Sequence, residues 1–243
     1  MIVADLPAHG ELRQSIAADG FVFVRGGAMR QTIAAITPLS DANAFAASWN
    51  DLCLDTYMAD GGRYRRRRHA TYLADPFSIV RVRHQPHYQD RAYNPLNGGV
   101  ARWFEPISPE VGAGPTMSAV LKFARGLFGE LAPFGTRWHV EVHQFRIEAR
   151  RGEPGLPTPE GVHRDGVDYV LVLLIGRTNI AQGVTTIHDV DGRPLGSFTL
   201  TDPFDAALLD DRRVAHGVTP VEPIDPAAPA HRDVLVVTFR VLG

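Results

Sequence analysis

From Trp138 to the C-terminus the chain is a series of short apolar stretches separated by turns, and this pattern limits the fold more than any other feature. The stretches are rich in β-branched and aromatic residues, which favours strands. We predict strands at 138–147, 167–175, 184–190, 197–200, 206–210 and 234–241. Many short strands at close spacing are typical of a sandwich, a jelly roll or a barrel.

The N-terminal half has a different pattern, in which apolar residues at helical spacing predominate. Helices are predicted at 12–18, 32–58 and 117–128, and strands at 20–26, 63–72 and 79–83. The sequence contains no internal repeat and no long linker. We therefore expect an α+β fold with a single domain over 1–243. A helix-rich part, 1–130, is expected to pack on a double-stranded β-helix (a jelly-roll or cupin-like barrel) formed by 138–243.

Composition narrows the range of functions. The formal net charge is −2, so we expect no overall attraction to nucleic acid or to a membrane surface. No apolar stretch reaches the ~18 residues of a membrane span, and Met1–Pro7 lacks the pattern of a signal peptide. Cys53 is the only cysteine, which excludes an internal disulfide and a cysteine-cluster metal site and favours a cytoplasmic location. The oligomeric state is not predicted.

A candidate metal site begins at Gly161-Val-His-Arg-Asp-Gly166. On an extended segment, His163 and Asp165 would point to the same face, because strand side chains alternate with period two. His216, placed where a strand gives way to a loop, is the predicted third ligand. Two imidazoles and one carboxylate suit Fe(II) and leave positions open for a cosubstrate and dioxygen. The alternative is a chance spacing, since the chain contains ten histidines.

A cation for the cosubstrate's far carboxylate is expected on the last strand, because arginine binds carboxylates through two hydrogen bonds. Residues 232, 234, 236, 238 and 240 share one face there. Arg232 and Arg240 are both candidates, but their α-carbons lie roughly 26 Å apart and both cannot bind one small diacid. We favour Arg232, with Thr238 as a hydroxyl partner. The alternative is an arginine that is solvated or paired with Asp233.

In this order, and on a strand-rich C-terminal half, these residues resemble the 2-oxoglutarate/Fe(II)-dependent oxygenases. More narrowly, the chain resembles the bacterial branch that hydroxylates free amino acids, the L-isoleucine dioxygenase-like proteins. The matching stretches run from about residue 60 to the C-terminus and are 60–65, 93–107, 143–147, 159–166 and 210–220.

The resemblance implies a dioxygenase whose Fe(II) is held by His163, Asp165 and His216. It also implies 2-oxoglutarate as cosubstrate, with its far carboxylate on Arg232, and O2 as the oxidant. The expected reaction hydroxylates a small polar substrate, above all a free L-amino acid, and releases succinate and carbon dioxide. The cofactor would supply the difficult chemistry while the protein supplies ligands, orientation and a dry pocket.

The chain departs from this branch at residues 179–185. The family tends to show Asn followed shortly by Gly-Gly-Glu, whereas this chain has Asn179-Ile-Ala-Gln-Gly-Val-Thr185. Gln182 and Val184 thus replace a glycine and the carboxylate. The departure bears on the identity of the primary substrate and not on the iron or cosubstrate sites.

The arginine run from Arg63 to Arg68 is the sharpest charge cluster. A nucleic-acid patch is disfavoured because the whole chain is not basic. Alternation on a strand sends Arg63, Arg65 and Arg67 to one face and Arg66 and Arg68 to the other. Most are expected to be surface residues paired with acids, and one of them is a candidate for holding a substrate carboxylate at the pocket mouth.

A second polar pattern lies on the predicted strand at 138–147. His139, Glu141 and His143 share one face, where structural packing is favoured over a second metal site. Gln144 and Arg146 lie on the opposite face and are candidate substrate contacts if that face lines the barrel.

Two other functions compete with an oxygenase. The first is a non-catalytic β-barrel that binds a metal or a small molecule. The second is a hydrolase that fills the same triad with zinc, which the absence of an obvious general base beside His163 disfavours.

Overall fold

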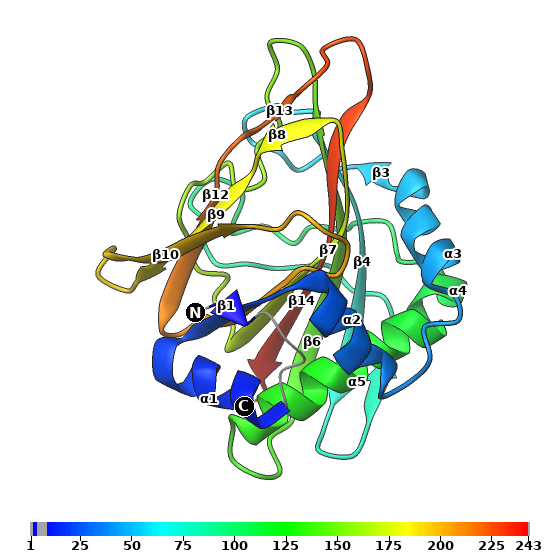
Figure 1. The fold of residues 1–243 in the computed structure, drawn as a ribbon, viewed down its shortest axis with the longest axis vertical. Coiled ribbons are helices and arrows are strands. Elements are labelled where there is room, and N and C mark those ends of the chain that lie inside the picture. Colours follow the sequence, from blue (N-terminus) through cyan, green and yellow to red (C-terminus); the bar gives the residue numbers. More distant parts are fainter. Residues whose placement is uncertain (1, 4–8, 243) are drawn as a thin grey trace.

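The structure, a computed structural model, describes residues 2–3 and 9–242, so most of the Met1–Pro7 stretch considered above falls outside it. Within these residues, one large sheet runs through the molecule (Figure 1). Its strands follow the order β1-β2-β11-β7-β14-β6-β4-β3, and β5 pairs with the C-terminal end of β4. All pairs in this sheet are antiparallel except β1–β2.

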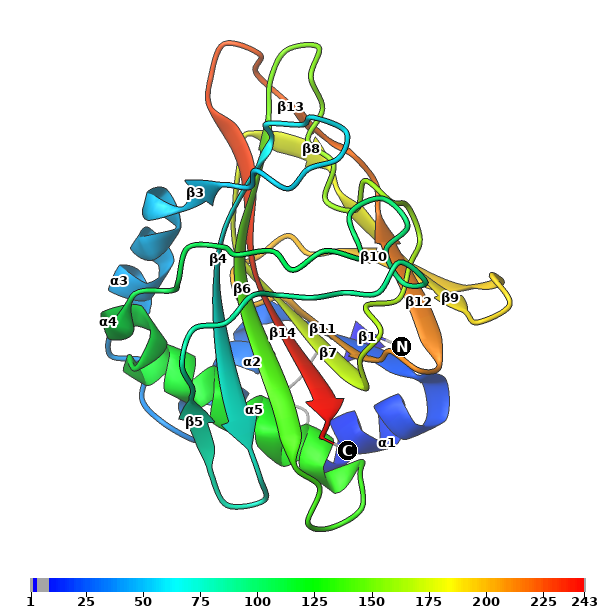
Figure 2. The same ribbon diagram turned by 180° about the vertical axis from the view of Figure 1, so that it is seen from behind.

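The bounds of these strands, in sheet order, are Ile2–Val3, Phe21–Val24, Ala206–Asp210, Tyr169–Thr178, Ala230–Val241, Trp138–Ala149, Arg65–Ala74 and Cys53–Leu54, with β5 at Ile79–Arg81. Figure 2 shows β4, β6, β14 and β7 side by side. Strands of the C-terminal half therefore form the centre of this sheet, and strands of the N-terminal half form its two sides. The N-terminal half is not a separate helical layer, because it supplies β2 on one side of the sheet and β4 on the other.

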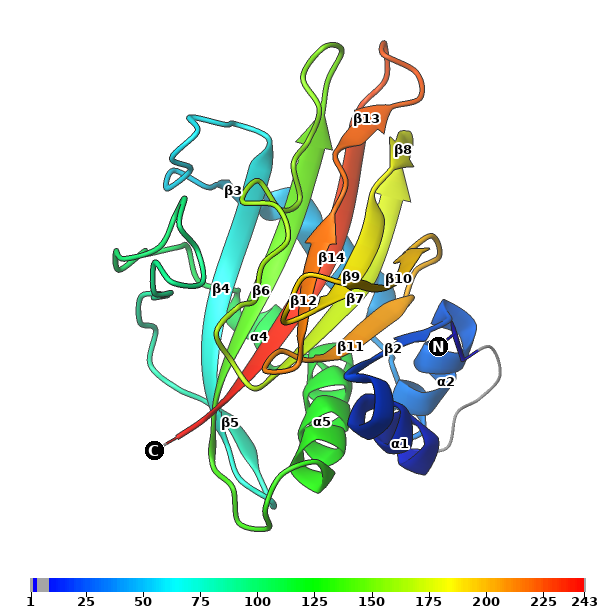
Figure 3. The same ribbon diagram turned by 90° about the vertical axis from the view of Figure 1, so that its left-hand side faces the viewer.

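A smaller β layer faces the large sheet. It consists of β10-β9-β12 (Pro194–Thr199, Val184–Asp189 and Val214–Val218) and of the pair β13-β8 (Val221–Pro223 and Ile180–Gln182). Figure 1 shows this layer to the left of the large sheet, and Figure 3 shows it in front of that sheet. Two facing β layers formed by antiparallel strands make the predicted jelly roll.

Helices cover the other face of the large sheet. They are α1 (His9–Asp19), α2 (Gly26–Ala34), α3 (Ala42–Ala47), a 3-10 turn at Ser48–Asp51, α4 (Pro109–Gly112) and α5 (Pro115–Glu130). The strand side chains that face them are apolar and fully buried, as Leu235, Val237 and Phe239 of β14 show. The opposite face of β14 carries residues 232, 234, 236, 238 and 240, all of which line a cavity between the two β layers. The predicted alternation along this strand is confirmed.

Two predicted elements were wrong. The helix predicted at 32–58 is broken into α2, α3, the 3-10 turn and β3. Pro38 lies in the first break, and proline disfavours a helical conformation in the residue before it. His216 was predicted at the end of a strand but is the middle residue of β12, a strand that its flanking Arg and Gly residues concealed. In the part of the chain that the structure describes, no helix is long and apolar enough to cross a membrane.

Candidate active site

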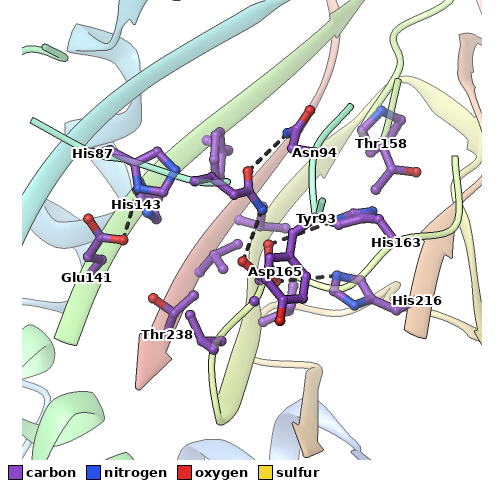
Figure 4. Close-up of a pocket in the computed structure, with 18 of the residues that line it drawn as sticks. His87, Tyr93, Asn94, Glu141, His143, Thr158, His163, Asp165, His216 and Thr238 are labelled. Carbon is purple, nitrogen blue, oxygen red and sulfur yellow. Dashed lines mark hydrogen bonds and ion pairs between the residues drawn. The ribbon is translucent and has the colours of Figure 1, made fainter. Parts of the chain in front are cut away.

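His163, Asp165 and His216 meet on one side of the cavity (Figure 4). His163 and His216 exchange two backbone hydrogen bonds of 2.9 and 2.8 Å. Nε2 of His163 lies 3.7 Å from Oδ1 of Asp165, and Nε2 of His216 lies 3.9 Å from Oδ2. One ligand atom from each residue lies within 4.8 Å of the other two, so small side-chain rotations bring all three onto one ion. The structure thus brings the predicted triad together.

The segment that carries His163 and Asp165 is shaped by two glycines and one carboxylate. Gly161 and Gly166 have φ of +83° and +79°, and a Cβ on Gly166 would lie 2.5 Å from the Tyr93 ring. Between β11 and β12, Asp211 accepts backbone hydrogen bonds of 2.9, 2.8 and 3.1 Å from residues 165, 166 and 167. Asp211 therefore fixes the backbone of Asp165. Sequence reasoning missed this role, although the residue lies inside the matching stretch 210–220.

The charges of the triad are strongly coupled. Burial alone would lower the pKa of His163, but the Asp165 carboxylate outweighs it and raises this pKa to about 9. Burial and the neighbouring His163 lower the pKa of His216 to about 4. Burial opposes ionisation of Asp165, yet the two histidines hold its pKa at about 2. The site therefore has an ionised carboxylate and one imidazole that stays neutral at pH 7.

Arg232 lies in the same cavity, at the other end of β14 from Thr238. It is 2% exposed, and its Nε and Nη2 atoms have no hydrogen-bond partner within the described residues. Burial and the nearby Arg177 lower its pKa to about 10, so it remains charged at pH 7. Its neighbour Asp233 binds Arg146 on the opposite face of the sheet through contacts of 2.8 and 2.7 Å. Arg232 is thus a buried cation with free donors, and Asp233 is not its principal partner.

The structure does not bring Thr238 or Arg240 to Arg232. Thr238 lies six residues further along β14, which is roughly 20 Å of strand, and pairs with Glu141 of β6. Arg240 is exposed near the end of the same strand. Both line the far part of the cavity. They are therefore too distant to share with Arg232 the carboxylate of one small diacid.

The cavity has a volume of about 440 Å³ and extends from the triad to β4 and β6. Arg65 and Arg67 of β4 point into this region and are 6% and 3% exposed. Asp55 binds both, at 2.8 Å from Arg65 and 3.5 Å from Arg67. Burial would raise the pKa of Asp55, but Arg67 and Arg65 hold it below its usual value.

Arg66 and Arg68 point to the opposite face of β4, as the alternation predicts, whereas Arg63 precedes the strand and is exposed. Arg66 binds Glu148 at 2.7 Å, and Arg68 binds Asp51 at 2.8 Å. The expectation of surface arginines paired with acids is therefore confirmed for these two, whereas Arg65 and Arg67 are buried.

Three histidines and one glutamate form a group beside the triad's cavity: Glu141 and His143 of β6 and His87 of the segment between β5 and α4 line the cavity, and His69 of β4 is buried next to them. Glu141 lies 3.3 Å from His69 and 2.9 Å from His87, while Nδ1 of His143 lies 2.7 Å from Arg67. Burial lowers the pKa of all three histidines, that of His69 to about 4. Their ligand atoms also lie within 4.8 Å of one another. His139, expected here, is replaced by His69 and His87, which only the tertiary fold brings to Glu141.

The segment between β5 and α4 closes the cavity opposite the sheet, and Figure 2 shows it crossing in front of the strands. Gln89 anchors it. Its amide nitrogen donates to the backbone carbonyl of Asp165 at 3.1 Å, and its carbonyl accepts from Asn94 at 3.0 Å and from Arg102 at 3.4 Å. One side chain thus connects this segment to the triad. Only membership of the matching stretch 93–107 pointed to Asn94 and Arg102.

Glu160 is a further acid beside the triad. One of its carboxylate oxygens lies 3.6 Å from Nε2 of His163, and the other is buried without a hydrogen-bond partner among residues 2–3 and 9–242. It lines the cavity with Thr158. Sequence reasoning quoted Glu160 only as part of a matching stretch and gave it no role. The expectation that no general base lies beside His163 was wrong, because this carboxylate lies there.

Several predicted contacts lie outside the cavity. Gln144 donates to Ser48 at 2.8 Å, on the helix-covered face, together with Arg146. The departure at Gln182 and Val184 falls at the turn between β8 and β9, where neither side chain is part of the described cavity lining. Gly183, between them, has φ +74°, and a Cβ there would lie 2.9 Å from Val221. Gln182 and Val184 therefore flank a glycine that lies near the Arg232 side chain, and neither residue lines the cavity.

The chain is similar to proteins of one family. The family described as 2OG-Fe dioxygenase matches residues 46–238. A crystal structure of a bsmA homolog from Methylobium petroleophilum PM1 superposes with a TM-score of 0.89 at 40% identity and covers 99% of this chain and 96% of that chain.

Two enzymes are more distant relatives. The 3(1)-hydroxy-L-isoleucine 4-dioxygenase of Pantoea ananatis is 24% identical and covers 95% of each chain. The L-isoleucine-4-hydroxylase of Bacillus thuringiensis is 25% identical, over 76% of this chain and 80% of that protein.

Proposed function

The chain belongs to the 2OG-Fe dioxygenase family, and from that premise we propose that it hydroxylates a free L-amino acid at the site formed by His163, Asp165 and His216. It is therefore an oxidoreductase that uses Fe(II), 2-oxoglutarate and O2. The observation that carries the site assignment is the convergence of two imidazoles and one carboxylate on one point of the cavity wall.

The donor set suits Fe(II), because two imidazoles and one carboxylate on one face are the ligands of this class of non-haem iron site. Metal binding would displace the proton from Nε2 of His163. Nδ1 of His163 lies 3.1 Å from the carbonyl of Gly161, which leaves Nε2 as the ligand atom. Nδ1 of His216 is buried and lacks a partner among the residues described. When bound, iron with its cosubstrate supplies the oxidising power for a C–H bond. The chain's residues position the reactants and exclude water.

For the cosubstrate, we propose that Arg232 binds the far carboxylate of 2-oxoglutarate. Its unpaired nitrogens and burial support this role, since a buried guanidinium gains most from a charged partner. Thr238 and Arg240 remain weaker candidates, because the length of β14 separates them from Arg232.

For the primary substrate, we propose a free amino acid. Two relatives that align over most of this chain are named for isoleucine or hydroxyisoleucine oxidation. A cavity of about 440 Å³ suits a small molecule together with the cosubstrate. A cytoplasmic location stays a prediction from the sequence.

The experiment is iron-dependent turnover of 2-oxoglutarate by anaerobically purified protein supplied with Fe(II) and then with air. Succinate release is measured with each proteinogenic amino acid. His163→Ala is expected to lower it at least about 100-fold and to lower the bound iron, because the site loses a ligand. The matched control is His188→Ala in β9, which lies outside the described cavity lining. Unchanged turnover and iron content in His163→Ala would contradict the assignment.

The rival functions make different predictions in the same experiment. A non-catalytic binding protein, which the family match does not favour, releases no succinate. A zinc hydrolase would contain zinc after anaerobic purification and would not consume 2-oxoglutarate.

A further inference from the structure

We propose that Arg67 and Arg102 bind the carboxylate of the primary substrate and that Glu160 binds its ammonium group, so that the cavity recognises both charged ends of an α-amino acid. This inference rests on the proposed function, because it assigns the part of the cavity away from Arg232 to the substrate.

The buried arginines of this region carry positive charges that favour an anionic ligand. Three guanidiniums, those of Arg65, Arg67 and Arg102, are buried in this region. Asp55 forms ion pairs with Arg65 and Arg67, whereas Glu141 contacts His69 and His87, and Glu160 contacts His163. Arg102 therefore has no ion-pair partner among the described residues, and its contact to the Gln89 carbonyl oxygen is long, at 3.4 Å. A buried guanidinium is costly unless an anion offsets its charge. Arg102, with Arg67 beside it, is therefore suited to an anionic ligand.

Arg67 and Arg102 have hydrogen-bond donors that none of the described residues uses. Nε of Arg67 and Nε of Arg102 are buried and unpartnered in the described part of the chain. The contacts that Arg67 makes to Asp55 and that Arg102 makes to Gln89 are long, at 3.5 and 3.4 Å. Arg67 is nevertheless held firmly, with its guanidinium 3.6 Å from the Phe104 ring centre and 4.4 Å from that of Phe145. Held guanidiniums with spare donors are well suited to a carboxylate.

Arg67 is well separated from Arg232, the proposed partner of the cosubstrate. Strand register places Arg67, Phe145 and Val234 in one row across β4, β6 and β14. Arg232 lies two residues further along β14, so its α-carbon is roughly 12 Å from that of Arg67. The cavity thus has two separate cationic centres. The far carboxylate of 2-oxoglutarate and the carboxylate of an amino acid therefore need separate partners.

Glu160 is the acidic residue that we assign to the ammonium group of the substrate. Glu160 has one carboxylate oxygen unpartnered in the described structure, and it lies beside the His163 end of the triad. Glu160 and Arg102 both line the cavity, and the charge of Glu160 raises the pKa of Arg102. An α-amino acid carries its carboxylate and ammonium a few bonds apart. Because Glu160 lies 3.6 Å from His163, an ammonium group bound to Glu160 would lie next to the triad.

The test begins with wild-type protein, so that folding of a variant plays no part. Anaerobic Fe(II)-loaded protein with 2-oxoglutarate is titrated calorimetrically with the twenty proteinogenic L-amino acids. The tightest binder is then compared with its carboxamide and with its des-amino acid. Each derivative is expected to bind at least about 30-fold more weakly, as expected for the loss of a buried charged contact. A carboxamide or des-amino acid that binds within about threefold of the amino acid overturns the proposal.

Two variants then assign the ends. Arg102→Gln should weaken the amino acid about 30-fold and leave the affinity for the carboxamide as it was, because that ligand has no carboxylate to lose. Glu160→Gln should weaken the amino acid and not the des-amino acid. The matched control is Arg66→Gln, on the outer face of β4. Equal losses for the amino acid and for both derivatives in either variant overturn the assignment.

The possible outcomes distinguish a failure of this inference from a failure of the proposed function. If 2-oxoglutarate binds and is consumed but no amino acid binds, this inference fails and the iron and cosubstrate assignment stands. If 2-oxoglutarate itself neither binds nor decays, the proposed function fails.

Discussion

His163 shows how a single side chain at this site depends on atoms that sequence spacing does not reveal. The carbonyl of Gly161 engages Nδ1, so Nε2 is the nitrogen that faces Asp165. The carboxylate of Asp211 accepts three backbone N–H groups from the segment that carries Asp165. Groups of this kind orient metal ligands and contribute to metal affinity. The triad thus depends on at least two residues besides its own members.

The residue scale gives a prediction for Arg232. Arg232→Gln should raise the KM for 2-oxoglutarate about 30-fold or more, because a buried charged contact to the far carboxylate is lost. Steady-state succinate release against 2-oxoglutarate concentration measures it. Arg240→Gln, on the same face of β14 but exposed, separates the two candidate arginines. A comparable rise in Arg240→Gln alone would transfer the role to Arg240.

A second prediction at this scale concerns Asp55, which is 2% exposed and binds Arg65 and Arg67. Asp55→Asn should lower the free energy of unfolding at pH 7 by about 3 kcal/mol, because it leaves buried guanidiniums unpaired. Since these arginines hold the pKa of Asp55 below the ordinary value, its contribution is present above about pH 3.9 and is lost as pH falls through the lowered pKa.

Urea unfolding of wild type and Asp55→Asn at a series of pH values measures this contribution. The two free energies should approach each other below about pH 3.9. A difference that is the same at every pH would show that the pair does not act through its charge.

At the scale of elements, the register of β4, β6 and β14 decides what the cavity wall contains. His69 of β4 lies opposite His143 of β6, and Thr238 of β14 lies opposite Glu141. A shift of one residue in β4 would send Arg65, Arg67 and His69 to the helix-covered face. The core residues of β4, Ala70, Tyr72 and Ala74, prevent this, because the same shift would remove them from the main core. Packing of the core thus fixes the polar wall.

The element scale gives a prediction about acid sensitivity. Burial lowers the pKa of His69 to about 4, while Glu141 opposes this and His87 and Arg67 add to it. The unfolded chain takes up a proton near pH 6.5, and the folded protein does so only near pH 4. Stability should therefore fall as pH falls between these values. His69→Gln should reduce that slope by up to about 1.4 kcal/mol per pH unit.

Urea unfolding from pH 7 to pH 4 measures this slope for both proteins. Parallel curves for wild type and His69→Gln would show that protonation of His69 does not limit acid stability.

At the scale of the whole molecule, the large sheet joins both halves of the sequence. β2 pairs with β11, and β4 pairs with β6, so neither half has a complete sheet by itself. The main core contains helix residues such as Leu12 and Phe123 together with Leu171 and Phe239 from the C-terminal strands. We infer that the described residues form one folding unit, in line with the single domain predicted from sequence.

This inference predicts one cooperative unfolding transition. Far-ultraviolet circular dichroism and tryptophan fluorescence should give the same midpoint in urea, because helices and strands lose their shared core together. Two resolved transitions, or midpoints that differ between the probes, would show that the helix-rich part unfolds separately.

The sequence by itself determined the class of fold and predicted which three residues form the proposed triad. Strand alternation and turn residues are local properties, and so is the pairing of His163 with Asp165 across one intervening residue. The shared face of residues 232–240 also follows from local geometry. These features were predicted because each depends on neighbours within a few positions in the chain.

Only the tertiary structure decided which distant residues meet. Strand pairing and the segment that covers the cavity bring Asp211 to the backbone of Asp165, His69 and His87 to Glu141, and Arg102 to Gln89. The tertiary structure also separated Thr238 from Arg232 and removed Gln182 and Val184 from the cavity lining described here. The physical reason is that burial and charge depend on every element packed around a group, whereas spacing along the chain records only its nearest neighbours.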